Sequence, residues 1–357
     1  MMCEKTFDVR IRKLHPMITP REVIDKLPLD EKRAKFVREN RADVEKTLNG
    51  HDNRLLCVVG PCSIHDPKAA AEYAQMLAEK AKEHSETLLI LMRTYFEKPR
   101  TTIGWKGLIN DPDINGTYNL AKGVVASRGV IFDVLDTGIG VATEFLDPIS
   151  PQYISDAVSW GAIGARTTES PIHRQLASGL SMPIGFKNTT EGSIQAAIDA
   201  TVAAKITHTF FSVNFDGRLI SAETDGNLAT HIILRGDKNG PNYDKRFVDE
   251  ALTLARLNDA PSTAQFGVII DAAHGNSKKN EVREAQVVRE LAERIRSGEK
   301  GISGIMMESF IEGGTQPAAP LACLKYGQSI TDPCIDWGTT SELLDELSDG
   351  VKVGRMS

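Results

Sequence analysis

The fold is decided by residues 88–102, LLILMRTYFEKPRTT, an apolar run that ends in cations, a proline and two threonines. Such a run predicts a buried parallel strand, and the polar residues after it then lie at its carboxyl end. Arg93, Lys98 and Arg100 offer planar forks and a mobile charge to phosphate or carboxylate groups. Thr101 adds a hydroxyl. The segment therefore predicts an anion-binding loop, with an ordinary solvated basic loop as the alternative.

The pattern of an apolar run followed by polar residues recurs along the chain. Apolar runs alternate with longer helical stretches and occupy residues 55–60, 88–93, 141–146, 161–166, 183–188, 208–214, 231–236, 266–274 and 302–309. An Asp-Gly turn within residues 214–231 predicts a β-hairpin inserted near the sixth strand, which leaves eight strands for the main sheet. We therefore predict an α/β fold, a (β/α)8 TIM barrel, whose chemistry gathers at the carboxyl ends of the strands.

An open doubly wound sheet is the alternative to the barrel. That fold usually carries a glycine-rich turn after its first strand. Here the first run is followed by GPCSIHDP at residues 60–67, which is not a dinucleotide-binding fingerprint. The sequence therefore favours the barrel.

Composition restricts the class of protein. The chain has 357 residues, 41% of them hydrophobic and 25% charged, with a net charge of -6, which argues against a nucleic-acid surface. No apolar run approaches the length of a membrane span, and the first thirty residues are too charged for a secretory signal. The five cysteines are few and odd in number, which fits a reducing compartment. We therefore expect a cytoplasmic protein.

Two regions are expected along the chain. Residues 1–50 contain a Thr-Pro-Arg-Glu helix start at Thr19 and a helical patch over residues 29–48, and they predict a regulatory or oligomerisation arm. Residues 51–357 form the predicted catalytic barrel, with the hairpin insertion at about 214–231.

Ionisable residues stand at almost every predicted strand end, and the set is Cys62, Arg93, Lys98, Arg100, Glu144, Arg166, Lys187, Arg235, His274 and Glu308. Cys62, His274 and Glu308, together with the later Asp332, are the residue types that bind a borderline divalent ion. No spacing motif joins these four residues, so only the barrel brings them together, and a buried structural cysteine is the alternative for Cys62. The six cations and one divalent ion exceed the three anionic ligands by about five charges, which suits two phosphorylated substrates.

Several blocks of the sequence resemble the signature blocks of the type I 3-deoxy-D-arabino-heptulosonate 7-phosphate (DAHP) synthases. These blocks are GPCSIHD at 60–66, YFEKPRTT at 95–102, GWKG at 104–107, GARTTES at 164–170 and GFKN at 185–188. The resemblance implies a metal-dependent (β/α)8 barrel that condenses phosphoenolpyruvate with erythrose 4-phosphate, the entry step of aromatic amino-acid biosynthesis. The chain departs from the family pattern at Ala273, where a serine is expected, at Asp237, and in the loop over residues 313–325.

The resemblance also implies roles for individual residues. The metal positions are Cys62, His274, Glu308 and Asp332, with Mn²⁺ favoured over Fe²⁺, Co²⁺ or Zn²⁺. The phosphoenolpyruvate positions are Arg93, Lys98, Arg166, Lys187 and Arg235, with the backbone of Ala165. The erythrose 4-phosphate positions are Lys98, Arg100 and Thr101. Glu144 and Lys187 are the candidates for handling water and protons, so the catalytic set is Lys98, Glu144, Lys187 and His274.

Members of the family differ in feedback inhibition by phenylalanine, tyrosine or tryptophan. The resemblance places the inhibitor near Pro151, Gln152, Ser181 and Ser212, and serine at position 212 favours phenylalanine. It also implies a homotetramer or a homodimer. Separately, Cys62 and Cys334 are expected to lie close enough to oxidise together when no ion is bound.

Two other functions stay open at this point. Lys187 stands at a strand end, which is the position at which a class I aldolase carries its Schiff-base lysine. A catalytically silent sensor of aromatic amino acids, retaining the barrel for assembly, is the second alternative.

Overall fold

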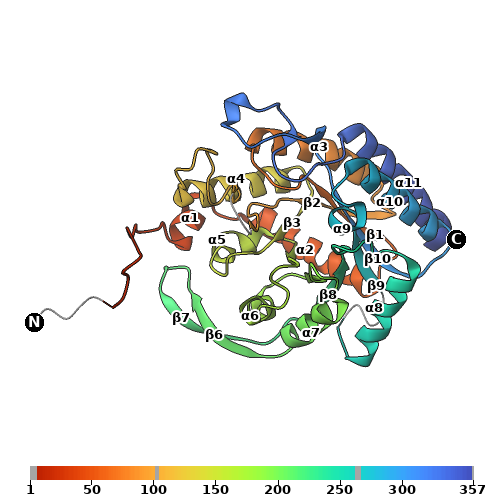
Figure 1. Cartoon of the computed structure of the whole chain (residues 1–357), viewed down its shortest axis with the longest axis horizontal. Coiled ribbons are helices and arrows are strands. Elements are labelled where there is room, and N and C mark those ends of the chain that lie inside the picture. The colour runs from red at the N-terminus through yellow and green to blue at the C-terminus, as the bar shows by residue number, and fades with distance from the viewer. Residues whose placement is uncertain (1–5, 101–103, 262–266, 356–357) are drawn as a thin grey trace, which may run out of the picture.

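Eight parallel strands close into a barrel in the computed structural model, which describes residues 6–100, 104–261 and 267–355 (Figure 1). Around the barrel the strand order is β1-β10-β9-β8-β5-β4-β3-β2, and every neighbouring pair is parallel. The barrel strands are β1 (Leu55–Gly60), β2 (Leu88–Arg93), β3 (Gly140–Glu144), β4 (Trp160–Ile163), β5 (Ile184–Lys187), β8 (Thr230–Leu234), β9 (Gly267–Asp271) and β10 (Gly301–Glu308). The predicted (β/α)8 barrel is therefore confirmed.

Helices connect the strands on the outside of the barrel, as right-handed parallel crossovers require. They are α3 (Pro67–Glu83), α4 (Leu120–Asp136), α5 (Pro151–Ile154), α6 (Pro171–Gly179), α7 (Ile194–Ala204), α8 (Lys245–Leu257) and α10 (Glu281–Arg296). Helix α11 (Trp337–Arg355) follows the last strand and packs against α10, and α9 (His274–Ser277) is a short turn after β9. Asp66 caps α3 by accepting a hydrogen bond from Lys68 N, and Pro67 begins that helix. Because the helices cover the outside of the barrel, the carboxyl ends of the strands and the loops that follow them are free to form a site.

The hairpin lies outside the barrel and begins earlier than the sequence predicted. Strands β6 (His208–Val213) and β7 (Leu219–Thr224) pair with each other in antiparallel register around the Asp-Gly turn, and among the described residues neither pairs with a barrel strand. Residues 208–214, counted among the nine candidate strands, therefore belong to the hairpin, which spans 208–224 rather than 214–231. Exposure alternates along β6 and β7, whereas each barrel strand from β1 to β5 is buried throughout. Alternating exposure, with one face covered and the other in water, is typical of a hairpin on the protein surface.

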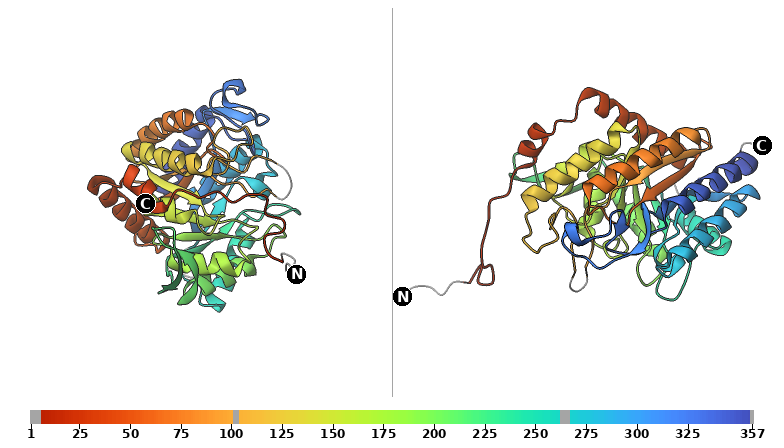
Figure 2. Two further views of the ribbon diagram at one scale, coloured as in Figure 1. Left: turned by 90° about the vertical axis from the view of Figure 1, so that its left-hand side faces the viewer. Right: turned by 90° about the horizontal axis from the view of Figure 1, so that it is seen from above.

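The first fifty residues have two parts. An extended segment leads to α1 (Pro20–Lys26), whose capping box at Thr19 and Glu22 matches the predicted helix start (Figure 2). Helix α2 (Glu31–Leu48) instead joins the barrel, because Val44 and Leu48 pack in the same buried cluster as inward-facing strand residues such as Leu56. The helix therefore closes one end of the barrel, whereas the extended segment lies away from it.

At the opposite end, short elements surround the mouth of the barrel. They include the turn α9 and the loop that carries β11 (Glu312–Thr315) and β12 (Gln328–Ser329). Gly60 ends β1 with φ +150, and a Cβ there would meet the backbone of Arg93 at 3.0 Å, so glycine permits this close approach. In the part of the chain that the structure describes, every helix is too short or too polar to span a membrane.

Candidate active site

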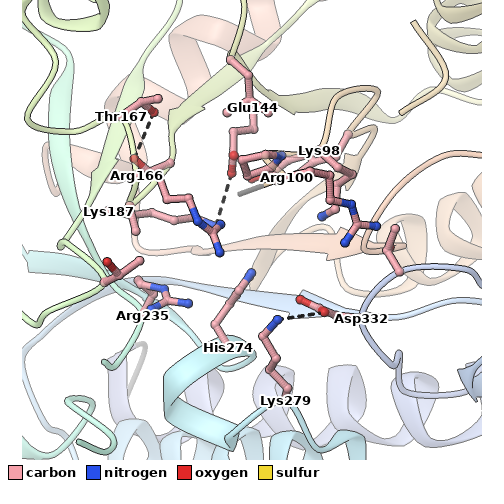
Figure 3. A pocket seen from close by; sticks show the side chains of 17 residues that line it. Lys98, Arg100, Glu144, Arg166, Thr167, Lys187, Arg235, His274, Lys279 and Asp332 are labelled. Atoms are coloured by element: carbon pink, nitrogen blue, oxygen red, sulfur yellow. Dashed lines mark hydrogen bonds and ion pairs between the residues drawn. The ribbon is translucent and has the colours of Figure 1, made fainter. Parts of the chain in front are cut away.

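The carboxyl ends of the strands deliver most of the predicted residues to one pocket (Figure 3). The predicted residues that line it are Lys98, Arg100, Glu144, Ala165, Arg166, Lys187, Arg235, His274 and Asp332. Cys62, Arg93 and Glu308 do not line this pocket, and all three are buried. Each contacts a residue that does line it: Cys62 contacts Lys98, Arg93 stacks on the ring of Tyr95, and Glu308 lies beside His274. Thr101, predicted as a ligand of erythrose 4-phosphate, lies outside the described residues.

Three predicted metal ligands form a tight cluster. The ligand atoms of Cys62, Glu308 and Asp332 all lie within 4.8 Å of one another. His274 contacts this cluster, because its Nε2 lies 3.7 Å from Oε1 of Glu308. A thiolate, an imidazole and two carboxylates are a donor set that suits a borderline divalent ion. The residues present therefore fit the metal that the family implies.

Buried cations stand beside two of these anionic groups. Arg93 Nη2 donates to Glu308 Oε1 at 2.9 Å, and Lys98 Nζ donates to Cys62 Sγ at 3.0 Å. Burial by itself lowers the pKa of Lys98, but the neighbouring Cys62 and Glu308 raise it above its ordinary value. Burial and Glu308 raise the pKa of the Cys62 thiol. An ion would therefore have to displace a proton from sulfur in order to bind the thiolate.

Lys187 is held by two carboxylates. Its Nζ lies 3.1 Å from Asp271 Oδ2 and 3.6 Å from Glu144 Oε2 (Figure 3 shows the second contact). Burial opposes the charge on Lys187, yet Asp271, Tyr95 and Glu144 raise its pKa above the ordinary value. The ammonium is therefore protonated. This does not favour a Schiff-base role, since a Schiff-base lysine needs a lowered pKa.

Two arginines remain available for anions. Arg166 and Arg235 line the pocket, and within the described part of the chain neither forms an ion pair with a carboxylate. Burial lowers the pKa of Arg235, Asp271 opposes that shift, and the like charge of Arg166 adds to it. Two neighbouring cations without carboxylate partners are the arrangement that a phosphate or carboxylate group stabilises.

The sequence interpretation missed three ionisable residues near the site. Asp271 contacts Lys187, and its Oδ2 also lies 2.9 Å from Nδ1 of His274. Although burial alone would raise the pKa of Asp271, the neighbouring positive charges hold that pKa well below the ordinary range. Glu284 on α10 accepts a hydrogen bond from Glu308 N at 2.6 Å, and Lys279 Nζ donates to Asp332 Oδ1 at 3.0 Å. Asp271 lies inside the predicted strand 266–274 and ends the observed strand β9, so its position was a usable signal. Glu284 lies on α10 and Lys279 on the turn between α9 and α10, where no pattern singled them out.

Cys334 lies close to Cys62, as the sequence predicted. The backbone N–H of Cys62 donates to Cys334 Sγ at 3.4 Å, and both cysteines are buried and unbridged. Burial and the neighbouring Cys62 raise the pKa of Cys334 well above its ordinary value. Joint oxidation of the two thiols stays a prediction.

The four residues predicted to bind an inhibitor lie on α5, after α6 and on the hairpin. Pro151 and Gln152 belong to α5, Ser181 follows α6, and Ser212 on β6 pairs with Ile220. None of the four lines the nearby cavity of about 410 Å³. That cavity is lined by residues of the arm and of the hairpin, and also by Glu97, Asp147 and Ser150 from the loops of the barrel.

Known proteins resemble this chain over nearly its whole length. A model of the DAHP synthetase I family matches residues 28–345. A phospho-2-dehydro-3-deoxyheptonate aldolase of Corynebacterium glutamicum is 48% identical, over 98% of this chain and 96% of that protein. A tyrosine-inhibited enzyme of the same name from Schizosaccharomyces pombe is 45% identical, over 98% of this chain and 94% of its own length.

Another relative and a solved structure agree with these matches. A Trp-sensitive enzyme of the same name from Escherichia coli strain K12 is 44% identical, over 97% of this chain and 98% of its own length. The structure of a phospho-2-dehydro-3-deoxyheptonate aldolase from Francisella tularensis superposes with a TM-score of 0.93 at 44% identity, over 97% of this chain and 99% of that one. The chain therefore belongs to the DAHP synthetase I family.

Proposed function

We propose that this chain, an enzyme of the DAHP synthase class, condenses phosphoenolpyruvate with erythrose 4-phosphate in a metal-dependent reaction that yields DAHP and phosphate. The observation that carries the proposal is the convergence of the pocket cations on a mouth that also holds the cluster of Cys62, Glu308 and Asp332. Two phosphorylated substrates need several cations, and an aldehyde that must accept carbon needs its oxygen polarised.

The metal site in this proposal consists of Cys62, His274, Glu308 and Asp332. When bound, a divalent ion supplies Lewis-acid polarisation of a carbonyl oxygen. Mn²⁺ is the favoured ion, with Fe²⁺, Co²⁺ and Zn²⁺ as alternatives. Carboxylates suit Mn²⁺, whereas the thiolate and the imidazole also suit Zn²⁺ and Fe²⁺. Arg93 and Lys98 then limit repulsion among the anionic ligands, because each already contacts one of them.

Arg166, Lys187 and Arg235 are the proposed ligands of phosphoenolpyruvate, beside the backbone of Ala165. Arg93 also belongs to this set, and its Nη1 supports the assignment, because that buried nitrogen has no hydrogen-bond partner among the described residues. An unpaired buried donor is costly, so an anionic group there would relieve it. Lys98 and Arg100 are the proposed ligands of erythrose 4-phosphate, with Thr101 beside them.

The proposed reaction forms one bond between carbons and one between carbon and the oxygen of water, and it breaks the bond between carbon and the bridging oxygen of the phosphate. The enol carbon of phosphoenolpyruvate attacks the aldehyde carbon, and cationic character develops at the carbon that bears phosphate. Water adds at that carbon, and inorganic phosphate then leaves with the bridging oxygen. We assign the proton that the water loses to Lys187 and Glu144, whose Nζ and Oε2 lie 3.6 Å apart, and the former aldehyde oxygen takes up a proton to become a hydroxyl.

An assay of inorganic phosphate release tests the activity. Phosphate should appear only when both substrates are present, should stop after treatment with a chelator, and should return when Mn²⁺ is added. Borohydride with a carbonyl substrate should trap nothing on Lys187, whereas trapping would favour the Schiff-base aldolase. Absence of phosphate release from the metal-loaded chain would contradict the proposal and favour a non-catalytic sensor.

We propose in addition that an aromatic amino acid inhibits the enzyme, with phenylalanine favoured. The support is that relatives carry the names Trp-sensitive and tyrosine-inhibited. The hairpin that carries Ser212 contacts α6, where Ser178 and Thr224 share a hydrogen bond of 2.7 Å between their hydroxyls. The phosphate-release assay, repeated with each aromatic amino acid, tests this point, and equal rates with and without all three would contradict it.

A further inference from the structure

Lys279 links two of the proposed metal ligands. Its side chain lines the pocket and reaches Asp332, with Nζ 3.0 Å from Oδ1 (Figure 3). Its backbone N–H donates to the carbonyl oxygen of His274 at 2.8 Å. Lys278 and Lys279 have backbone φ angles of +53 and +57, values that residues other than glycine rarely adopt. Such a conformation is strained and persists only where surrounding contacts hold it, and the two contacts of Lys279 with His274 and Asp332 are contacts of this kind.

The Lys279–Asp332 pair differs from the other cation contacts in the cluster. Arg93 is fully buried. Lys98 Nζ donates to two atoms of Cys62, the sulfur at 3.0 Å and the carbonyl oxygen at 2.9 Å. The side chain of Lys279 is 54% exposed, and that of Asp332 is 26% exposed. Ion pairs open to water are weak and exchange readily, whereas buried pairs do not. Of these three contacts, the one at Asp332 is the easiest to exchange.

A divalent ion and the lysine would use the same carboxylate. Asp332 has its ligand atom within 4.8 Å of those of Cys62 and Glu308. An ion at the centre of the cluster brings two positive charges near the single charge of Lys279, and like charges this close repel each other. The ion gains more from the carboxylate than the lysine does, because the ion carries two positive charges and the lysine one.

We propose that Lys279 is an exchangeable counterion of the metal site, which neutralises Asp332 before the ion binds and leaves that carboxylate when the ion arrives. The inference rests on the proposed metal site. Lys279 then lowers the affinity for the ion, because the contact between Lys279 and Asp332 must break first. It also keeps the vacant cluster from accumulating unpaired negative charge at the pocket mouth.

Titration of the chelator-treated full chain with Mn²⁺ alone, followed by calorimetry, tests this role. Lys279→Met removes the charge and keeps the length, and we expect Mn²⁺ to bind about five times more tightly or better. Lys279→Arg keeps the charge and should bind within about twofold of the unsubstituted chain. Lys278→Met is the matched control, since it removes the same charge one residue away on the same left-handed turn, and it should also stay within about twofold.

The outcomes separate this inference from the proposed function. Unchanged or weaker Mn²⁺ binding by Lys279→Met overturns the inference, and weaker binding would mean that the lysine orients Asp332 for the ion. An equal gain in Lys278→Met also overturns it, because the effect would then come from net charge rather than from the contact. Absence of Mn²⁺ binding by the unsubstituted chain overturns the metal site itself. Lys279→Gln, with a shorter neutral side chain, repeats the test if the methionine variant does not fold.

Discussion

At the scale of single residues, Glu97 carries a carboxyl group into an environment that opposes its charge. It is 6% exposed, and its Oε2 accepts hydrogen bonds from Ser150 Oγ at 2.9 Å and Leu146 N at 3.4 Å. Burial raises the pKa of Glu97 to about 7; the hydrogen bond from Ser150 opposes the shift, and the neighbouring Asp147 adds to it. Folding therefore favours the protonated form.

The raised pKa of Glu97 predicts how stability depends on pH. The folded chain holds this proton up to about pH 7, whereas the unfolded chain releases it near the ordinary pKa of 4.5. Stability from this residue is therefore complete below about pH 4.5 and is lost as the pH rises through about 7. Glu97→Gln should be more stable than the unsubstituted chain at about pH 8, by up to about 3 kcal/mol, with no such gain at about pH 4.5.

Denaturant unfolding at these two pH values measures the difference. Glu250 on α8 is exposed, so Glu250→Gln makes the same chemical change without burial and should leave stability nearly unaltered at both. A gain for Glu97→Gln that is equal at low and high pH would show that the substitution acts through packing and not through the proton.

At the scale of elements, the loop after β2 is held by contacts between its two ends. Lys98 N donates to Lys106 O at 2.9 Å, and Ile109 N donates to Phe96 O at 3.3 Å. Gly107 stands at this crossing with φ +110, and a Cβ there would lie 2.1 Å from Phe96 O. Only glycine allows the two ends to approach this closely, and the approach positions the Lys98 ammonium beside Cys62.

Substitution of Gly107 by alanine should therefore move the segment that carries Lys98. We expect Gly107→Ala to lose about 2–4 kcal/mol of stability, because the new methyl group meets backbone atoms that cannot yield without distorting the loop. Gly116→Ala is a suitable control, since Gly116 also has positive φ, +74, but a Cβ there would meet nothing within 4 Å. That control should lose only about 1 kcal/mol in denaturant unfolding. Equal losses in both variants would contradict the role of the close approach.

At the scale of the whole molecule, the hairpin and the extended segment before α1 expose apolar side chains. Phe211 and Leu219 on the hairpin are 86% and 72% exposed, and Phe7 and Leu14 of the segment are 71% and 75% exposed. Clustered exposure of this kind is typical of an interaction surface. The resemblance implies a homotetramer or a homodimer, and we propose that these exposed segments form the contact between copies of the chain.

The double variant Phe211→Ser with Leu219→Ser should have a lower assembled mass in sedimentation or light scattering, since it removes apolar surface from the proposed interface. Leu257 at the end of α8 is 77% exposed, and Leu257→Ser provides a matched control away from the hairpin. Assembly that persists unchanged in the double variant, or that is weakened equally by the control, would mean that the hairpin is not the interface.

The sequence by itself determined the barrel and most residues of its mouth. Hydrophobic runs end where the chain must meet water, so residues such as Glu144 and Lys187 could be assigned to strand ends before any partner was known. Parallel strands in a closed barrel then place those ends on one face. The signature blocks strengthened the same assignment, because they coincide with the strand-end loops.

Only the tertiary structure decided which side chains meet. Barrel closure places Arg93 beneath the pocket against Glu308, and it brings Lys279 to Asp332 across 53 positions of the chain. The tertiary structure also showed that β6 belongs to a surface hairpin and that α2 closes the barrel. These contacts join segments far apart in sequence, and they depend on the register of all eight strands together. Local patterns record the period and polarity of one segment, and therefore carry no information about its distant neighbours.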